Sequence, residues 1–247
     1  MNSAYHRPVP YGSELANATS RQLQSTSPAL IIPVGSTEQH GPHLPLDTDT
    51  RIATAVARAL AVQLAPANES KWMVAPAIEY GASGEHEEFS GTVSIGTSAL
   101  RLMLVEFGRS ASRWASRLVF VNGHGGNVEA LATAAALLRY EGRDVGWCPC
   151  SAENADAHAG HTETSVLLHI SPADVWIDER VPGNSAPLGQ LMPAMRQGGM
   201  AAVSEVGILG DPTTATAEEG ARIFAEMVDG CLRRVTRWTP DRNGMLT

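Results

Sequence analysis

The chain has 247 residues, of which 43% are hydrophobic and 18% are charged, and its formal net charge is −8 at pH 7. This composition is that of a folded chain, and the length fits one large domain or two small ones. An acidic chain without Lys/Arg clusters is poorly suited to nucleic-acid backbones or anionic membranes. No apolar run approaches the roughly 20 residues that a membrane helix needs. Residues 1–26 contain no apolar core of a secretory signal, so we expect a cytoplasmic protein.

Apolar patterning predicts alternating strands and helices along most of the chain. Residues 1–27 are polar and lack a clear period, which predicts an N-terminal arm before a single domain of residues 28–247. In chain order the pattern predicts a strand at 29–34, a helix at 51–64, a strand at 72–75, a helix at 99–114 capped by Ser98, a strand at 118–121, a helix from 128 that ends before Gly142, a strand at 145–148, and helices at 164–169 and 217–234. This alternation predicts an α/β fold, a three-layer αβα sandwich with a mostly parallel central sheet.

Three polar segments follow predicted strands. Residues 35–49 come after the first strand, residues 122–127 after the third and residues 156–165 after the fourth. In such folds ligands bind outside the carboxyl ends of the strands, where these loops would lie. Seven of the eight histidines lie in or beside polar loops of this kind: His40, His43, His86, His124, His158, His161 and His169. We therefore expect the functional site at this edge of the sheet.

The residue types in these loops favour a divalent metal. Imidazole and carboxylate groups together suit Zn, Fe or Mn. Burying several carboxylates without a cation is costly through desolvation and mutual repulsion. Glu38 and His40 are two residues apart, so on an extended segment both point to one face. With Asp49 and His124 they form the predicted metal site.

Each residue also has a simpler interpretation. Asp49 alone is typical of a helix N-cap, and residues 123–127 alone are typical of an anion-binding turn. Glu163 alone could lie on an exposed first helical turn, where the helix dipole favours a negative charge. The Glu-rich segment 85–88 is typical of a solvated loop, whose best functional use is to line a substrate entrance. Three such clusters at strand ends, however, favour a common site over isolated surface residues.

The motifs resemble those of the creatininase family over residues 28–235. The likeness rests on residues 35–45, Asp49, Asn122-Gly123-His124, residues 158–165, and Gly210-Asp211-Pro212 followed by Ala215 and Gly220. The resemblance implies an αβα hydrolase with two metal ions, often hexameric. Members of the family open cyclic amides or cleave formamides and related C–N bonds.

The resemblance also implies how the ligands are shared. Glu38, Asp49 and His124 would hold one metal, and His40 with the bridging Asp49 and a second carboxylate would hold the other. Creatininase has a glutamate two residues after its match to His124, where this chain has Gly126. Glu163 is the best substitute for that ligand. We expect two divalent ions, Zn and/or Fe(II), with Mn as a further candidate.

A second departure bears on the substrate. Creatininase has a tryptophan four residues before its match to His158, and this chain has Asn154 there, which argues against creatinine. The opening residues 1–7 and the segment 46–53 resemble the mycofactocin-system peptidases of the same family. Those enzymes release the modified C-terminal Val-Tyr dipeptide from a radical-crosslinked precursor peptide. The resemblance therefore implies that this peptide is the substrate and that the chain forms a homo-oligomer.

In the expected reaction His158 and Glu163 are the catalytic candidates, His158 as proton shuttle and Glu163 chiefly as ligand. No Gly-x-Ser-x-Gly elbow or activated cysteine points to a covalent route. A small-molecule cyclic amidase or formamide hydrolase is the alternative enzyme. A non-catalytic protein that binds a peptide or a metal is the alternative from another class.

Overall fold

Four parallel strands form the centre of the molecule. The computed structural model describes residues 13–24, 26–65 and 71–247. The strands are β1 (Ala29–Val34), β2 (Trp72–Val74), β3 (Arg117–Asn122) and β4 (Val145–Pro149). They are ordered β2-β1-β3-β4, and every neighbouring pair is parallel. The predicted parallel sheet is confirmed.

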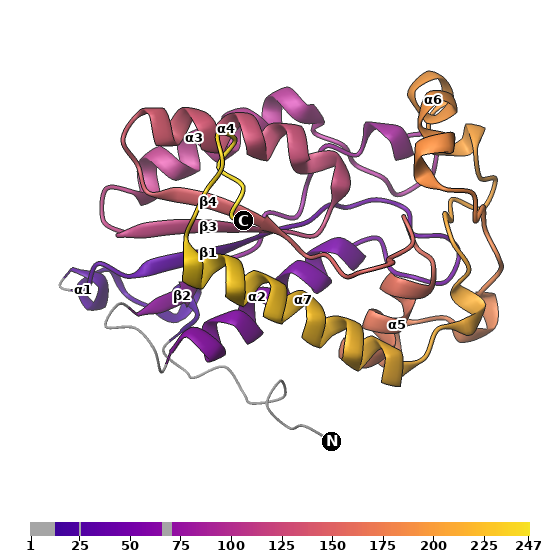
Figure 1. Ribbon diagram of the computed structural model, residues 1–247, viewed down its shortest axis with the longest axis horizontal. Helices are drawn as coiled ribbons and strands as arrows, with labels where there is room; N and C mark the ends of the chain where they lie inside the picture. The colour runs from indigo at the N-terminus through magenta and orange to yellow at the C-terminus, as the bar shows by residue number, and fades with distance from the viewer. Residues whose placement is uncertain (1–12, 25, 66–70) are drawn as a thin grey trace.

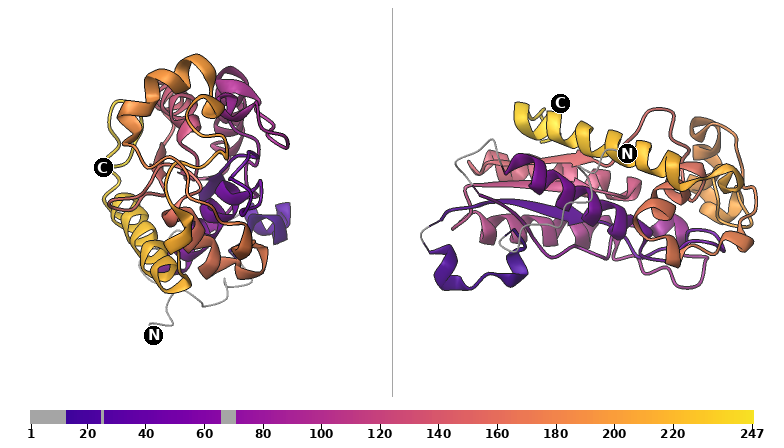
Figure 2. Two further views of the ribbon diagram at one scale, coloured as in Figure 1. Left: turned by 90° about the vertical axis from the view of Figure 1, so that its right-hand side faces the viewer. Right: turned by 90° about the horizontal axis from the view of Figure 1, so that it is seen from below.

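Helices cover both faces of this sheet. They are α1 (Ser20–Leu23), α2 (Thr48–Leu64), α3 (Gly96–Ala111), α4 (Val128–Tyr140), α5 (His161–Ile170), α6 (Leu188–Gly198) and α7 (Ala217–Arg237). Figures 1 and 2 show α3 and α4 on one face and α2 and α7 on the other, with α5 and α6 beyond one end of the strands. The three-layer αβα arrangement predicted from the sequence is therefore confirmed.

The central strand β1 explains why the sheet lies between two helical layers. All six of its residues are buried. Successive side chains of a strand point to opposite faces, so Leu30 and Ile32 pack in the core beneath α3 and α4, and Ile31 packs in the core beneath α2 and α7. An uninterrupted apolar run is typical of a parallel strand that is buried on both faces.

Both outer strands have a neighbour that limits their exposed edge. Glu14 forms an isolated parallel bridge to Val74 of β2. On the opposite edge the C-terminal segment lies along β4, where the N–H of Trp147 donates to the carbonyl of Gly244 and the N–H of Leu246 donates to the carbonyl of Trp147. Covered edges cannot pair with the strands of another chain.

Several helix boundaries differ from the prediction. Helix α2 begins at Thr48 after the N-cap residue Asp47, so Asp49 lies within the first turn and is not its cap. Helix α3 begins at Gly96, which places Ser98 inside the helix rather than at its cap. Helix α5 begins at His161, three residues earlier than expected.

Helix α6 was not predicted, because Pro193 and two glycines interrupt its helical pattern. The expected N-terminal arm contains α1 and a 3₁₀ turn at Leu15–Asn17, while residues 1–12, with the opening motif 1–7, lie outside the described residues. The boundary between residues 27 and 28 stays a prediction. Within the described ranges, no helix is long and apolar enough to cross a membrane.

Candidate metal centre

The predicted site residues converge at the carboxyl ends of β1 and β3. The loop after β1 carries Glu38 and His40, and Asp49 follows in the first turn of α2. His124 lies two residues after the end of β3, and Glu163 lies in the first turn of α5. Thus the three polar segments that follow the first, third and fourth strands meet at one end of the sheet, as the sequence predicted.

One group of donors consists of Glu38, Asp49 and His124. Their ligand atoms lie within 4.8 Å of one another, and all three residues are buried. Nδ1 of His124 is 3.2 Å from Oε1 of Glu38 and 3.2 Å from Oδ2 of Asp49. The hydroxyl of Ser36 donates to Oδ2 of Asp49 at 2.7 Å, which orients that carboxylate.

A second group consists of His40, Asp49 and Glu163, again within 4.8 Å. Nε2 of His40 lies 3.2 Å from Oδ1 of Asp49 and 3.8 Å from Oε2 of Glu163. The N–H of Ala159 donates to Oε2 of Glu163 at 2.6 Å and so fixes its carboxylate. The two groups share Asp49, whose two oxygens face different histidines.

A third group joins His158 to Glu38 and His40. Nε2 of His158 lies 2.9 Å from the backbone oxygen of Gln39, which can only accept, so Nε2 carries the proton. Nδ1 is then unprotonated, and it lies 3.7 Å from Oε1 of Glu38. The imidazole of His158 also stacks at 4.4 Å on that of His40.

Gln39 orients His86, a histidine that the sequence did not assign to the metal site. The N–H of Gly41 donates to Oε1 of Gln39 at 2.8 Å, which sets the orientation of the amide. Nε2 of Gln39 then donates to Nδ1 of His86 and to the backbone oxygen of Gly207, each at 2.9 Å. His86 is therefore protonated at Nε2, which lies 3.5 Å from Oε1 of Glu38.

The electrostatics of the centre follow from burial opposed by neighbouring charges. Burial lowers the pKa of His40, but the charge and hydrogen bond of Asp49 and the charge of Glu163 raise it to about 10. Burial raises the pKa of Asp49, yet His40 and His124 hold it well below its usual value. Burial raises the pKa of Glu163 to about 7, against the charge of His40. A positive charge among these carboxylates is thus strongly favoured.

The donor set fits divalent cations. Glu38 is fully buried, and neither of its carboxylate oxygens has a hydrogen-bond partner within the described part of the chain. A buried carboxylate without partners is costly unless a cation satisfies it. Imidazole and carboxylate donors match Zn, Fe and Mn. Each of the two groups that share Asp49 could hold a metal ion.

The structure shows that Gly126 has no room for the glutamate that the family resemblance implies at this position. A Cβ atom at Gly126 would lie 2.2 Å from the backbone oxygen of Ala82 and 2.4 Å from Nε2 of His124. Glu85 also approaches this point, with Oε1 3.6 Å from Nε2 of His124. Neighbouring atoms therefore fill the space of a side chain at Gly126, and Glu163 brings a carboxylate to the centre from α5.

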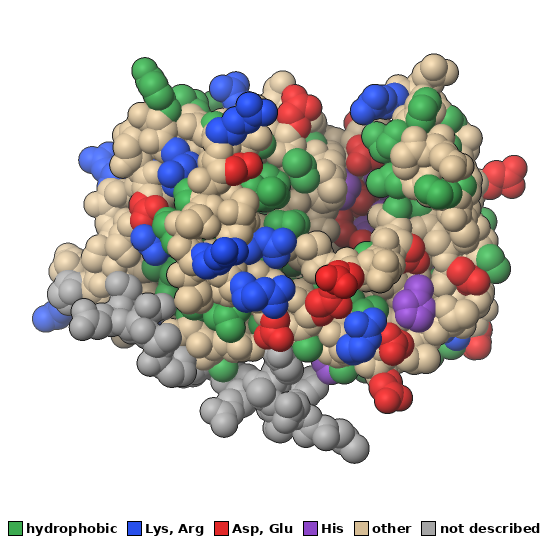
Figure 3. All heavy atoms as spheres, in the orientation of Figure 1, with side chains coloured by type: hydrophobic (Ala, Val, Ile, Leu, Met, Phe, Trp, Pro, Cys, Tyr) green, Lys and Arg blue, Asp and Glu red, His purple; other side chains and the backbone are tan. Residues whose placement is uncertain are grey.

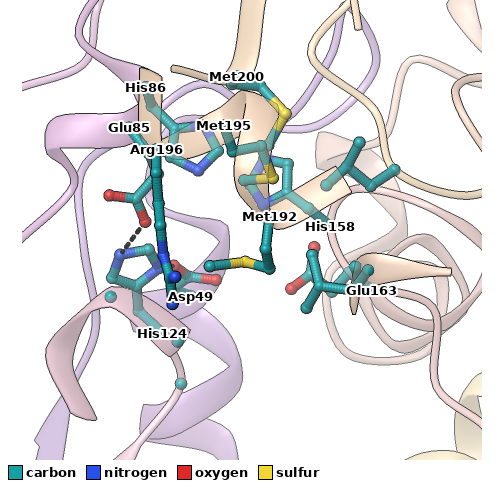
Figure 4. Close-up of a pocket in the computed structure, with 16 residues that line it drawn as sticks. Asp49, Glu85, His86, His124, His158, Glu163, Met192, Met195, Arg196 and Met200 are labelled. Carbon is teal, nitrogen blue, oxygen red and sulfur yellow. Dashed lines mark ion pairs between the residues drawn. The ribbon is translucent and has the colours of Figure 1, made fainter. Parts of the chain in front are cut away.

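A pocket of about 430 Å³ opens onto the centre. Asp49, Glu85, His124 and Glu163 are among its lining residues, and α6 supplies others (Figure 4). Figure 3 shows the corresponding hollow, with acidic and histidine side chains deep inside it. Glu85 thus lines an entrance, as its sequence context suggested, while Glu87 and Glu88 are exposed.

Comparisons with known proteins show the family of the chain. A family model described as creatinine amidohydrolase matches residues 13–235. Mycofactocin precursor peptide peptidases of Mycolicibacterium smegmatis and Mycobacterium tuberculosis are 71% and 67% identical to the chain, and each match covers 100% of both sequences. Solved creatininase structures described as an Mn form and, for a variant, as Zn-Zn type each have a TM-score of 0.75 at 25% identity and cover 93% of this chain and 99% of theirs. The chain belongs to the creatininase family.

Proposed function

We propose that this chain is a metal-dependent peptidase that releases the modified C-terminal Val-Tyr dipeptide from the mycofactocin precursor peptide. The observation that carries the proposal is the pair of donor groups that share the buried Asp49 beneath an open pocket. Full-length relatives named as peptidases of that precursor support the choice of substrate. The relatives named creatinine amidohydrolase and pyrimidine deformylase are only 28% and 32% identical, which makes the small-molecule alternative weaker.

The cofactor we propose is a pair of divalent cations, Zn and/or Fe(II), with Mn as a further candidate. Glu38, Asp49 and His124 would hold one ion, and His40, Asp49 and Glu163 the other. When bound, such cations polarise the scissile carbonyl and lower the pKa of a water molecule, which supplies the nucleophile. Mn and Zn-Zn forms among the solved creatininase structures support this choice of metals.

His158 is the residue we propose to move the proton. Its Nε2–H donates a hydrogen bond to the Gln39 carbonyl, so Nδ1 is the atom that can accept a proton. The pKa of His158 lies well below its usual value, because burial and the charge of His40 disfavour the imidazolium. A neutral His158 can take a proton from the nucleophile and pass it to the leaving amine. Glu163, with a pKa of about 7 in the metal-free centre, is the second candidate for this transfer.

We also propose a cytoplasmic homo-oligomer, a hexamer by family resemblance, whose partner is the precursor peptide rather than nucleic acid. The net charge of −8 supports the exclusion of nucleic acid. Native mass spectrometry of the purified chain measures the number of copies directly. A monomer at micromolar concentration would contradict the oligomer.

The experiment that tests the function uses the crosslinked precursor peptide and mass spectrometry. Metal-loaded protein should release the dipeptide, chelation should stop the release, and Zn, Fe(II) or Mn should restore it. Release by the metal-free protein would contradict the metal-dependent mechanism. An intact peptide together with hydrolysis of a cyclic amide or formamide would support the small-molecule alternative.

A further inference from the structure

The side of the pocket formed by α6 and its neighbours differs from the metal centre opposite. Leu188, Met192 and Met195 of α6 line the pocket together with Met200 and Leu209. Figure 4 shows the three methionine side chains gathered on this side, with Met192 extending between Asp49 and Glu163. Methionine thioethers adapt their shape to a ligand and make favourable contacts with aromatic rings. We call these five residues the methionine wall.

Arg196 is the one Lys or Arg residue among those lining the pocket, and it comes from the same helix. In Figure 4 its side chain extends toward the region of Asp49 and His124. Among the residues that the structure describes, no carboxylate lies within ion-pair distance of its guanidinium. An arginine at the edge of an acidic pocket without its own carboxylate partner is available to a ligand.

The side chains around Arg196 decide which ligand group suits this position. Three methionines and two leucines line the same pocket, so a ligand beside Arg196 also meets an apolar surface. An uncharged aromatic ring matches both the guanidinium and this surface. The planar guanidinium stacks on a ring face, and the thioethers pack against its edge.

We propose that Arg196 and the methionine wall form a subsite for an uncharged aromatic side chain of the peptide substrate, within the dipeptide that is released. The identity of that peptide rests on the proposed function, whereas the preference for an aromatic ring rests on the pocket itself. The ring packs between the guanidinium and Met192. Its place in the pocket sets the scissile bond, one residue before the ring, against the metal centre.

Two pocket-lining positions of α6, Met192 and Arg196, lie outside the hydrophobic clusters of the protein. Leu191, Met200 and Leu209 form a small hydrophobic cluster that is separate from the two cores on the faces of the sheet. Neither Met192 nor Arg196 belongs to any of these clusters. Substitutions at these two positions therefore test recognition rather than folding.

The test measures binding of two uncharged probes, valyl-tyrosine amide and valyl-leucine amide, to the metal-loaded protein by calorimetry. Wild type should bind the tyrosine probe roughly tenfold more tightly, as expected for combined cation–π and sulfur–aromatic contacts. Arg196→Gln and Met192→Ala should each remove most of this preference, and Met192→Leu should retain part of it. Gln197→Ala is the matched control, because Gln197 is exposed on α6 and does not line the pocket.

Equal binding of the two probes to wild type would overturn the subsite, as would an unchanged preference in both Arg196→Gln and Met192→Ala. Cleavage of the precursor peptide by wild type, followed in parallel, keeps the two proposals apart. An intact precursor with a preserved preference for the tyrosine probe contradicts the peptidase function alone. A cleaved precursor without that preference contradicts the subsite alone.

Discussion

Nε2 of His158 lies 2.9 Å from the backbone carbonyl oxygen of Gln39, and this contact determines which nitrogen of the imidazole is basic. Nε2 donates its proton to this backbone oxygen, so Nδ1 is unprotonated and its lone pair lies on the side of Glu38. Glu38 cannot supply a proton there, because His124 holds its pKa below the usual value against the effect of burial. A lone pair facing a carboxylate indicates that a proton or a cation belongs between them.

His158→Asn removes this basic nitrogen. We expect kcat for peptide cleavage to fall by roughly 10²–10⁴-fold, the usual contribution of a general acid–base group. The metal content, measured by plasma mass spectrometry, should stay at the wild-type value, because both donor groups that share Asp49 remain. His161→Asn is the control, since that partly exposed histidine pairs with Thr214. Loss of metal from His158→Asn would instead make His158 a ligand.

Glu163→Gln tests the carboxylate assigned to the second ion. Of the second donor group only Asp49 and His40 remain in this variant, so we expect metal content to fall from about two ions to about one per chain. Asp49→Asn should lose both ions, because both groups share that residue. Glu153→Gln, an exposed change, should keep two. Full occupancy in Glu163→Gln would remove Glu163 from the ligand set.

Gly126→Ala and Gly125→Ala form a matched pair in one loop. A Cβ at Gly126 meets the backbone oxygen of Ala82 and the ring of His124, while a Cβ at Gly125 has no atom within 4 Å. We expect Gly126→Ala to lower the free energy of unfolding by about 1–3 kcal/mol, as overpacking does, and to weaken metal binding through His124. Gly125→Ala should behave like wild type. Urea unfolding and metal titration measure both, and equal behaviour of the two variants would contradict the crowding at Gly126.

His43 makes stability depend on pH in a predictable direction. It is fully buried and contacts Thr164 through Nε2, and burial lowers its pKa from 6.5 to about 4. Because the unfolded chain takes up the proton first, stability is lost as the pH falls from 6.5 to about 4. The loss from this group is about 3 kcal/mol at 1.36 kcal/mol per pKa unit.

Urea unfolding of the metal-free protein between pH 7 and pH 4 measures this effect. The decline should be shallower in His43→Gln than in wild type, since the variant has no imidazole to protonate at that position. His161→Gln should follow the wild-type curve. Parallel curves for wild type and His43→Gln would mean that His43 does not titrate within this window.

The sequence was sufficient to predict the sheet and the convergence of four candidate donors at one of its ends. Each predicted strand has a continuous apolar run, and such a run is typical of a parallel strand that is buried on both faces. Glu38, His40, Asp49 and His124 were found because parallel strands bring their following loops to one edge. The order of strands and helices along the chain was enough to predict that these four side chains lie at the same edge.

The contributions of Gln39, His86 and Arg196 could not be predicted. Gln39 and His86 meet only after loops 47 residues apart have packed together, and local periodicity carries no signal for such a contact. Arg196 lies on α6, whose central Pro193 is a helix breaker by local propensity. Packing of Leu191 and Met195 into a small hydrophobic cluster with Met200 and Leu209 stabilises this helix despite the proline.

The separate hydrophobic cluster beneath α6 has an evolutionary consequence. Mutations in this helix are largely decoupled from the stability of the two main cores, so selection can change the substrate range of the enzyme at little cost to folding. The donor residues do not have that freedom, because Glu38, His40, Asp49 and His124 are buried and Asp49 belongs to both donor groups. We therefore expect new specificities to arise within this scaffold first through replacements in residues 188–198.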